Sequence, residues 1–292
     1  MALVSAYSGR RAAGASVRDA RTGAVTDRVK PPAGESFTRV TSAGQGAFFL
    51  TGSGARDDSP LVYRLQVDAA GRAGQLAPVP GDLLPPGCRQ IAASPGGTLL
   101  AYTVPDMTAP LSTAEAGLVD LATGERRIVS VPAGSLGKLS LANDGQTLAF
   151  QWQPRSGGAP DVYVAPAAAS DWVAQGRVLA DADGLPYDAE NPVISADGRA
   201  VYLTVVQPEP TGGPHWNRLL EAPAGGGQHR VLFELRYQPN RNVFYMWGPV
   251  CRDPAGEWLL AFATGYVYRI EISSGAVIRL PFPEGQPYDA AW

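Results

Sequence analysis

The chain has 292 residues, of which 45% are hydrophobic and 17% charged, and its formal net charge is −3. This is enough apolar sequence for one large folded unit, and the lack of any clustered basic stretch disfavours binding to nucleic acid. The two cysteines form no CxxC pair, which excludes a zinc site of the usual spacing, and no apolar run approaches the roughly 20 residues of a membrane-spanning helix.

A polar turn containing glycine, followed by a short apolar strand, recurs about every fifty residues. The five copies, turn and then strand, are 42–46 with 47–50, 94–97 with 98–102, 142–145 with 146–150, 195–198 with 199–203, and 253–256 with 257–262. Repeats of this length without a helical period predict an all-β propeller, a ring of small antiparallel sheets called blades.

A second motif, a strand that leads into a tight turn, has six copies. They lie at 16–23, 61–71, 118–124, 162–165, 219–225 and 267–275. Glycine suits the positive φ that such hairpin turns need. We therefore predict a single domain over 1–292 with six blades of four antiparallel strands each. The expected boundaries are 289–292 plus 1–30 for blade 1, then 36–80, 88–132, 137–180, 190–235 and 245–281 for blades 2 to 6.

The first blade lacks an innermost strand at the N-terminus. Residues 3–7 already match the second strand of a blade, as in 99–102, whereas 288–292 resemble the run that precedes the other turns. We expect the C-terminal strand to pair with the N-terminal blade and so close the ring, which hides a sheet edge and ties down both ends.

The loops that precede the inner strands are long and rich in polar and aromatic residues, and they share one face of the ring. Because loops carry function more often than strands do, we predict that this long-loop face binds the ligand, whereas the short glycine turns form the opposite face. The candidate binding residues are Arg89, Tyr187, Asp188, Glu190, His215, Arg241, Tyr245, Trp247, Tyr288 and Asp289.

Two interpretations of these residues stay open. Asp188, Glu190 and Asp289 could form an anionic channel mouth for a cation or basic partner, or an acid/base pair. We favour the interpretation that each aspartate accepts backbone N–H bonds and stabilises its own loop. The aromatic run 242–247 beside Arg241 could anchor a peptide or small ligand, but we favour an inner strand packed between blades.

The histidines and cysteines offer little chemistry. His215 lies in a proline- and glycine-rich loop on the long-loop face and His229 begins an outer strand, and their distant contexts give no spacing for a metal site. Cys88 and Cys251 fall in blades on opposite sides of the ring, so we expect two free, buried thiols rather than a disulfide. A Cys88 nucleophile assisted by Arg89 is disfavoured, because no histidine is near in sequence.

Residues 93–102 (ASPGGTLLAY) followed by 117–126 (GLVDLATGER) resemble the WD40-like repeat of TolB-type six-bladed propellers, which also occurs in dipeptidyl-peptidase-IV-like enzymes. The resemblance covers the whole chain at repeat level. It implies a scaffold that binds protein partners at its channel mouth, commonly outside the cytoplasm, and it transfers no individual functional residue. The additional α/β domain of TolB, the G-x-S-x-G motif of the peptidases and the Gly-His and Trp-Asp marks of true WD40 repeats are all missing.

We therefore predict a non-catalytic binding scaffold that recognises a protein or peptide at the long-loop face and channel mouth. We expect a monomer without cofactor or metal that neither binds nucleic acid nor inserts into a membrane. The alternatives are a small-molecule hydrolase or lyase that uses Asp188, Glu190, Asp289 and His215, and an accessory domain of a membrane-anchored regulator. The compartment is extracytoplasmic if an anchor or signal precedes this sequence, and cytoplasmic if the chain is complete as written.

Overall fold

The computed structural model describes residues 2–9, 12–53, 61–85, 87–109, 112–179, 188–207, 215–237, 247–263, 266–280 and 289–292. These residues form strands and turns, with no helix among them. In chain order the strands are β1 (Ala2–Gly9), β2 (Ala12–Asp19), β3 (Val25–Val29), β4 (Ser36–Ser42), β5 (Ala47–Ser53), β6 (Leu61–Val67), β7 (Ala73–Pro78), β8 (Gln90–Ala93), β9 (Leu99–Pro105), β10 (Thr113–Asp120), β11 (Arg126–Val129), β12 (Gly134–Leu141), β13 (Thr147–Pro154), β14 (Asp161–Pro166), β15 (Arg177–Val178), β16 (Asp188–Ile194), β17 (Ala200–Gln207), β18 (His215–Pro223), β19 (Arg230–Tyr237), β20 (Trp247–Arg252), β21 (Trp258–Ala263), β22 (Tyr266–Glu271), β23 (Val277–Leu280) and β24 (Asp289–Ala291).

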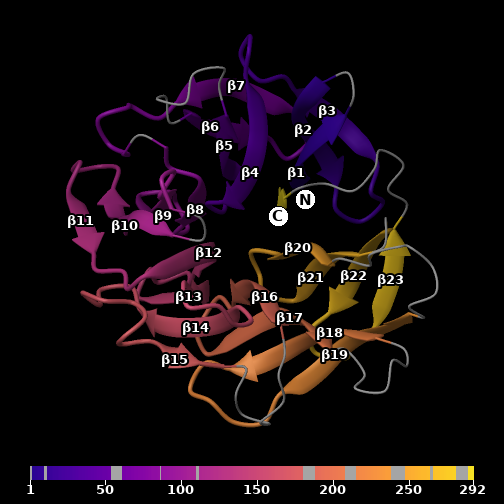
Figure 1. The fold of residues 1–292 in the computed structure, drawn as a ribbon. Helices are drawn as coiled ribbons and strands as arrows, with labels where there is room; N and C mark the ends of the chain where they lie inside the picture. Colours follow the sequence, from indigo (N-terminus) through magenta and orange to yellow (C-terminus); the bar gives the residue numbers. More distant parts are fainter. Residues whose placement is uncertain are drawn as a thin grey trace.

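The strands form six antiparallel sheets of four strands each, which are the blades of a propeller. Blade 1 has the order β24-β1-β2-β3, and blades 2 to 6 each take four successive strands, beginning at β4, β8, β12, β16 and β20. Figure 1 shows the blades following one another around a central axis in chain order, with the first strand of each nearest the axis. The predicted six-bladed propeller is confirmed.

The apolar strands that stood out in the sequence lie inside the blades and are buried on both faces. In β5, the run from Ala47 to Leu50 is buried at all four positions. Phe48 and Leu50 pack against Val4 and Val17 of blade 1, whereas Phe49 packs with Leu100 and Tyr102 of blade 3. A strand covered on both faces reads as a continuous apolar run rather than as an alternation. The core is therefore a set of layers between neighbouring blades.

Each glycine turn links an inner strand to the second strand of its blade. In the turn after β8, the Gly97 amide donates to the Ser94 carbonyl at 2.9 Å and the Leu99 amide to Ser94 Oγ at 3.2 Å. Gly97 has φ +66°, and a Cβ there would lie 3.0 Å from the Phe49 ring and 3.1 Å from Ala43 in blade 2. Both the backbone conformation and the close approach of the next blade require glycine.

The C-terminal strand closes the ring, as predicted. β24 pairs antiparallel with β1, with Val4 opposite Ala291 and Ala6 opposite Asp289. Trp292 is 3% exposed and packs with Cys251 and Phe262 of blade 6. Both chain ends therefore lie near the axis, where Figure 1 marks them side by side.

Side chains on outer strands hold neighbouring blades together at the rim. Arg127 on β11 donates to the carbonyls of Ala168 and Ala169 in blade 4, and Arg177 on β15 donates to the Gly225 carbonyl in blade 5. Arg230 on β19 donates to the Ile272 carbonyl in blade 6 at 2.6 Å. In each case the fourth strand of one blade bonds the turn between the third and fourth strands of the next. We call these contacts rim staples.

Candidate functional site

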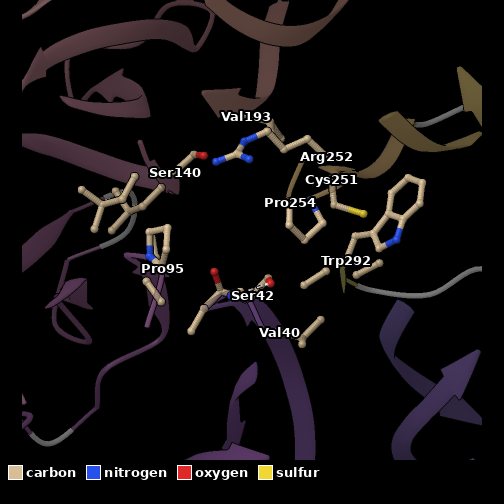
Figure 2. Close-up of a pocket in the computed structure, with 18 of the residues that line it drawn as sticks. Val40, Ser42, Pro95, Ser140, Val193, Cys251, Arg252, Pro254 and Trp292 are labelled. Carbon is tan, nitrogen blue, oxygen red and sulfur yellow. Dashed lines mark hydrogen bonds between the residues drawn. The ribbon is translucent and has the colours of Figure 1, made fainter. Parts of the chain in front are cut away.

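A cavity of about 230 Å³ opens on the propeller axis. Its lining comes from the C-terminal ends of the six inner strands and from the glycine turns that follow them. Every blade contributes: Ser42, Pro95, Ser140, Val193, Arg252 and Trp292 come from six different blades and surround the opening in Figure 2. We call this space the turn-face cavity.

The turn-face cavity lies at the other end of the channel from the long-loop face. The inner strands run from the long loops to the glycine turns, and the cavity is lined by their last residues. The long loops fall largely outside the described residues, so a binding surface on their face stays a prediction.

An ion pair crosses the channel beside the cavity. Lys138 on β12 places Nζ 3.2 Å from Asp289 Oδ1 on β24 and 3.3 Å from the Val250 carbonyl on β20. Asp289 Oδ2 accepts the Val40 amide of β4 at 3.1 Å. The two charged residues come from blades 4 and 1, which are opposite each other in a ring of six. We call this set of bonds the channel brace.

Arg252 is the other cation that lines the turn-face cavity among the described residues. Its Nε donates to the Ile194 carbonyl at 2.7 Å, Nη1 to the Asp253 carbonyl at 3.3 Å, and Nη2 to Asn143 Oδ1. Burial lowers the pKa of Arg252, and the charges of Asp253, Tyr202 and Asp197 act in the opposite direction. The guanidinium is thus a partly dehydrated cation whose bonded acceptors are neutral oxygens, and it extends toward Ser140 in Figure 2.

The two thiols are free and buried, as the sequence predicted. Burial raises the pKa of Cys251, which lines the cavity, to about 12. Burial, and then the charge of Glu115, raise the pKa of Cys88 to about 12. A thiol that stays protonated at neutral pH is a poor nucleophile and a poor metal ligand. Neither cysteine is therefore prepared for catalysis.

The predicted site residues do not gather in one place in the described structure. Asp289 is buried in the channel brace, where it bonds a backbone N–H of the neighbouring blade rather than of its own loop. Arg89 lies just before β8, with Nη2 3.8 Å from Met107 Sδ, and Glu190 lies within β16 opposite Thr204.

Three other candidates are placed by their backbone alone. Asp188, His215 and Trp247 are the first residues of β16, β18 and β20. His215 thus begins a strand, opposite Tyr237, instead of lying in a loop. The candidates Tyr187, Arg241, Tyr245 and Tyr288 lie outside the described residues.

The sequence interpretation missed Lys138 and Arg252. A signal for Lys138 existed, because it is one of two lysines in an arginine-rich chain and sits within an inner strand. Arg252 directly precedes a glycine turn at the end of its inner strand, a position that in the other blades holds small or apolar residues such as Ser42, Ala93 and Leu141. An arginine at this position in one blade alone was the signal in the sequence that could have identified Arg252.

In the parts of the chain that the structure covers, no group of three or more His, Cys, Asp or Glu side chains converges as a metal site. The same parts hold no helix long and apolar enough to span a membrane.

No protein-family model matches the chain, and no curated protein matches it. Solved structures do. TolB from Acinetobacter baumannii superposes with a TM-score of 0.65 at 15% identity, over 100% of this chain and 65% of that one. A putative TolB from Agrobacterium tumefaciens gives 0.59 at 15% identity, over 96% of this chain and 88% of that one. This chain has the TolB-type propeller fold.

The same fold also underlies enzymes. An oligogalacturonate lyase in complex with manganese matches with a TM-score of 0.56 at 14% identity, over 91% of this chain and 70% of that one. The chain spans less than two thirds of the Acinetobacter TolB. At these identities the likeness concerns the fold, and function has to be argued from the site.

Proposed function

We propose that this TolB-type propeller is a non-catalytic binding scaffold that takes a short segment of a protein or peptide into the mouth of its central channel. The observation that carries the proposal is the turn-face cavity, to which all six blades contribute a residue. A concave site with apolar walls and a few polar groups is the usual form of a ligand pocket. Its position on the axis suits a chain end or a single side chain.

The ionisable groups near the cavity support binding rather than catalysis. The carboxylate of Asp289, on which the hydrolase or lyase alternative depends, already bonds Lys138 and the Val40 amide. The Cys251 thiol has a pKa of about 12. General acid/base catalysis works best with a pKa near the operating pH, and the Cys251 thiol does not fit that role. The long-loop face remains a second surface for the same kind of partner.

A cavity-filling variant tests the proposal. Ser42 is half-buried and lines the cavity, so Ser42→Trp places an indole in the opening. A library of random twelve-residue peptides, displayed on phage with free C-termini, is selected against the wild-type protein, and the enriched peptides are measured by isothermal titration calorimetry. We expect micromolar dissociation constants for the wild type and a loss of at least tenfold in Ser42→Trp.

The matched control is Ser273→Trp, which adds the same side chain in an exposed outer turn of blade 6 and should leave binding unchanged. Thermal unfolding verifies that both variants are folded. Failure to enrich any peptide, or equal binding by Ser42→Trp, contradicts the proposal of a peptide site at this end of the channel.

A further inference from the structure

We propose that the turn-face cavity is a carboxylate site, in which the Arg252 guanidinium holds the carboxylate at the end of a short organic chain. The inference rests on the proposed binding function and gives its ligand a chemical class.

The first argument is the geometry of Arg252. A guanidinium carries five N–H donors in a planar fork. Three of its nitrogens each donate one bond, to Ile194 O, Asp253 O and Asn143 Oδ1. These bonds fix the plane of the group and use three of the five donors, so that one N–H on each Nη is left for a ligand. A fork of fixed orientation matches the two oxygens of a carboxylate.

The second argument is charge. Of the described side chains that line the cavity, those of Lys138 and Arg252 are charged and none is Asp or Glu. Lys138 is balanced by Asp289 at 3.2 Å, whereas the bonded acceptors of Arg252 are two carbonyls and an amide oxygen. The nearby Asp253 carboxylate is engaged by the amides of Glu257 and Trp258. A partly buried cation with neutral partners favours an anion as its additional ligand.

The third argument is size. A cavity of about 230 Å³ lies below the range of about 300–1,000 Å³ for the pockets of drug-sized ligands. The cavity therefore accepts one residue or a small acid, not a folded surface.

The fourth argument is the character of the walls. Val40, Val193, Val250 and the prolines Pro95, Pro192 and Pro254 make much of the wall apolar. A carboxylate with a short apolar body uses both the guanidinium fork and these apolar walls. A free small acid and the C-terminus of a peptide share this chemistry.

The test compares ligands that differ in the carboxylate alone. The acetylated tripeptide Ac-Gly-Ala-Val is titrated into the wild-type protein as the free acid and as the C-terminal amide, and binding is measured by calorimetry. We expect the acid to bind at least tenfold more tightly than the amide. N-acetylvaline distinguishes the sources: binding as tight as that of the tripeptide assigns the site to small acids, and weaker binding assigns it to peptide C-termini.

Variants then assign the effect to the guanidinium. Arg252→Gln should abolish the preference for the acid. Arg199→Gln, at an exposed arginine in a turn on the same face, should keep it. Equal affinity of acid and amide in the wild type overturns the inference even if Arg252→Gln does not fold, and so does the absence of binding to any probe. The phage selection with Ser42→Trp tests the binding function separately, since it imposes no terminal group in the pocket.

Discussion

Lys138 and Asp289 are held by each other and by the backbones of two further inner strands. Asp289 has a side chain 7% exposed, and that of Lys138 is 21% exposed. Removing one member of a buried pair leaves the other charge without compensation, which costs more than the intact pair contributes. The channel brace therefore makes the stability of the ring depend on single side chains at its axis.

Lys138→Met should lower the free energy of unfolding by about 2–3 kcal/mol, somewhat less than for a fully buried pair because the lysine is partly hydrated. Urea denaturation followed by tryptophan fluorescence measures the change. Lys30→Met, at the exposed other lysine, is the matched control and should stay within about 0.5 kcal/mol. A similar small effect for Lys138→Met would mean that the brace contributes little.

At the residue scale, a prediction from sequence succeeded where the separation of blades around the ring was sufficient to make it. Cys88 and Cys251 were expected to be free and buried because their blades lie apart. Asp289 was expected to cap its own loop or to stay open to a ligand. Its actual partners, Lys138 and the Val40 amide, come from other blades, so they follow from how closely the inner strands approach at the axis. A single sequence carries no record of that distance.

Rim staples connect the blades pairwise, and their direction is the same wherever they occur. Blade 1 follows the rule without arginine: Thr26 Oγ1 donates to the Gly71 carbonyl at 2.8 Å and the Ala73 amide to Asp27 Oδ2 at 2.9 Å. The acceptors of the arginine staples are turn carbonyls, which any residue supplies. A bond to a backbone carbonyl therefore leaves no signal in the sequence of the accepting turn. The turns and strands were predictable from local pattern, but the arginine staples between blades were not.

Arg127→Ala should destabilise the protein by about 1–2 kcal/mol, since it removes charge-assisted bonds to two carbonyls of blade 4. Its neighbour on the same strand, Arg126, is exposed, so Arg126→Ala is a control of the same size and charge. Thermal and urea unfolding of the pair give the difference. Equal stability of the two variants would show that the Arg127 staple has no energetic weight.

Strand β24 should be indispensable for a well-formed blade 1. A chain that ends at Tyr288 loses the buried side chains of Ala290, Ala291 and Trp292 and exposes the edge of β1. Losing the Trp292 indole alone should cost about 3–5 kcal/mol, and an open edge invites association. We expect a melting temperature lower by at least 10 °C or oligomers in size-exclusion chromatography. If the truncated chain melts as a monomer like the full one, the closure is not needed.

Several aspartates around the ring accept hydrogen bonds that favour the charged form of the carboxyl group. Bonds from the amides of Thr123 and Ala122 lower the pKa of Asp120. Bonds from the amides of Ala73 and Arg28 lower the pKa of Asp27, which lies between blades 1 and 2. The Ser195 hydroxyl and the Arg199 amide lower the pKa of Asp197. In each case the folded state binds its proton less tightly than the unfolded chain does.

Stability should consequently fall in acid. Because these folded pKa values are depressed below the ordinary 3.8, their contribution is present above about pH 4 and is lost as the pH falls through the folded values. The contribution of these groups to the free energy of unfolding should be the same at pH 7 and pH 5, and urea unfolding should give a lower free energy at pH 3. Asp120→Asn should show a smaller loss between pH 5 and pH 3. A free energy that rises toward pH 3 would contradict the sign.

At the scale of the molecule, the fold was readable from sequence and the site was not. The glycine turns and apolar strands repeat because each blade meets the same neighbours, so periodicity reports architecture. The chemical character of the turn-face cavity depends on Arg252, the cation that breaks the repeat at the end of its inner strand. Long loops drew attention to the other face, since loop length is visible in a sequence and the volume of a cavity is not.

Because β24 pairs with β1, the fold does not depend on the point in the ring at which the chain begins. In five blades a short turn joins the inner strand to the second one, and in blade 1 the two chain ends stand where that turn would be. A short linker between Trp292 and Met1, with new ends between Gly157 and Gly158 in the exposed connection from β13 to β14, would give a circular permutant with every strand pairing intact. Such a permutant should fold. Its new termini would lie on the face opposite the turn-face cavity, so labels or partners attached there would not cover the cavity.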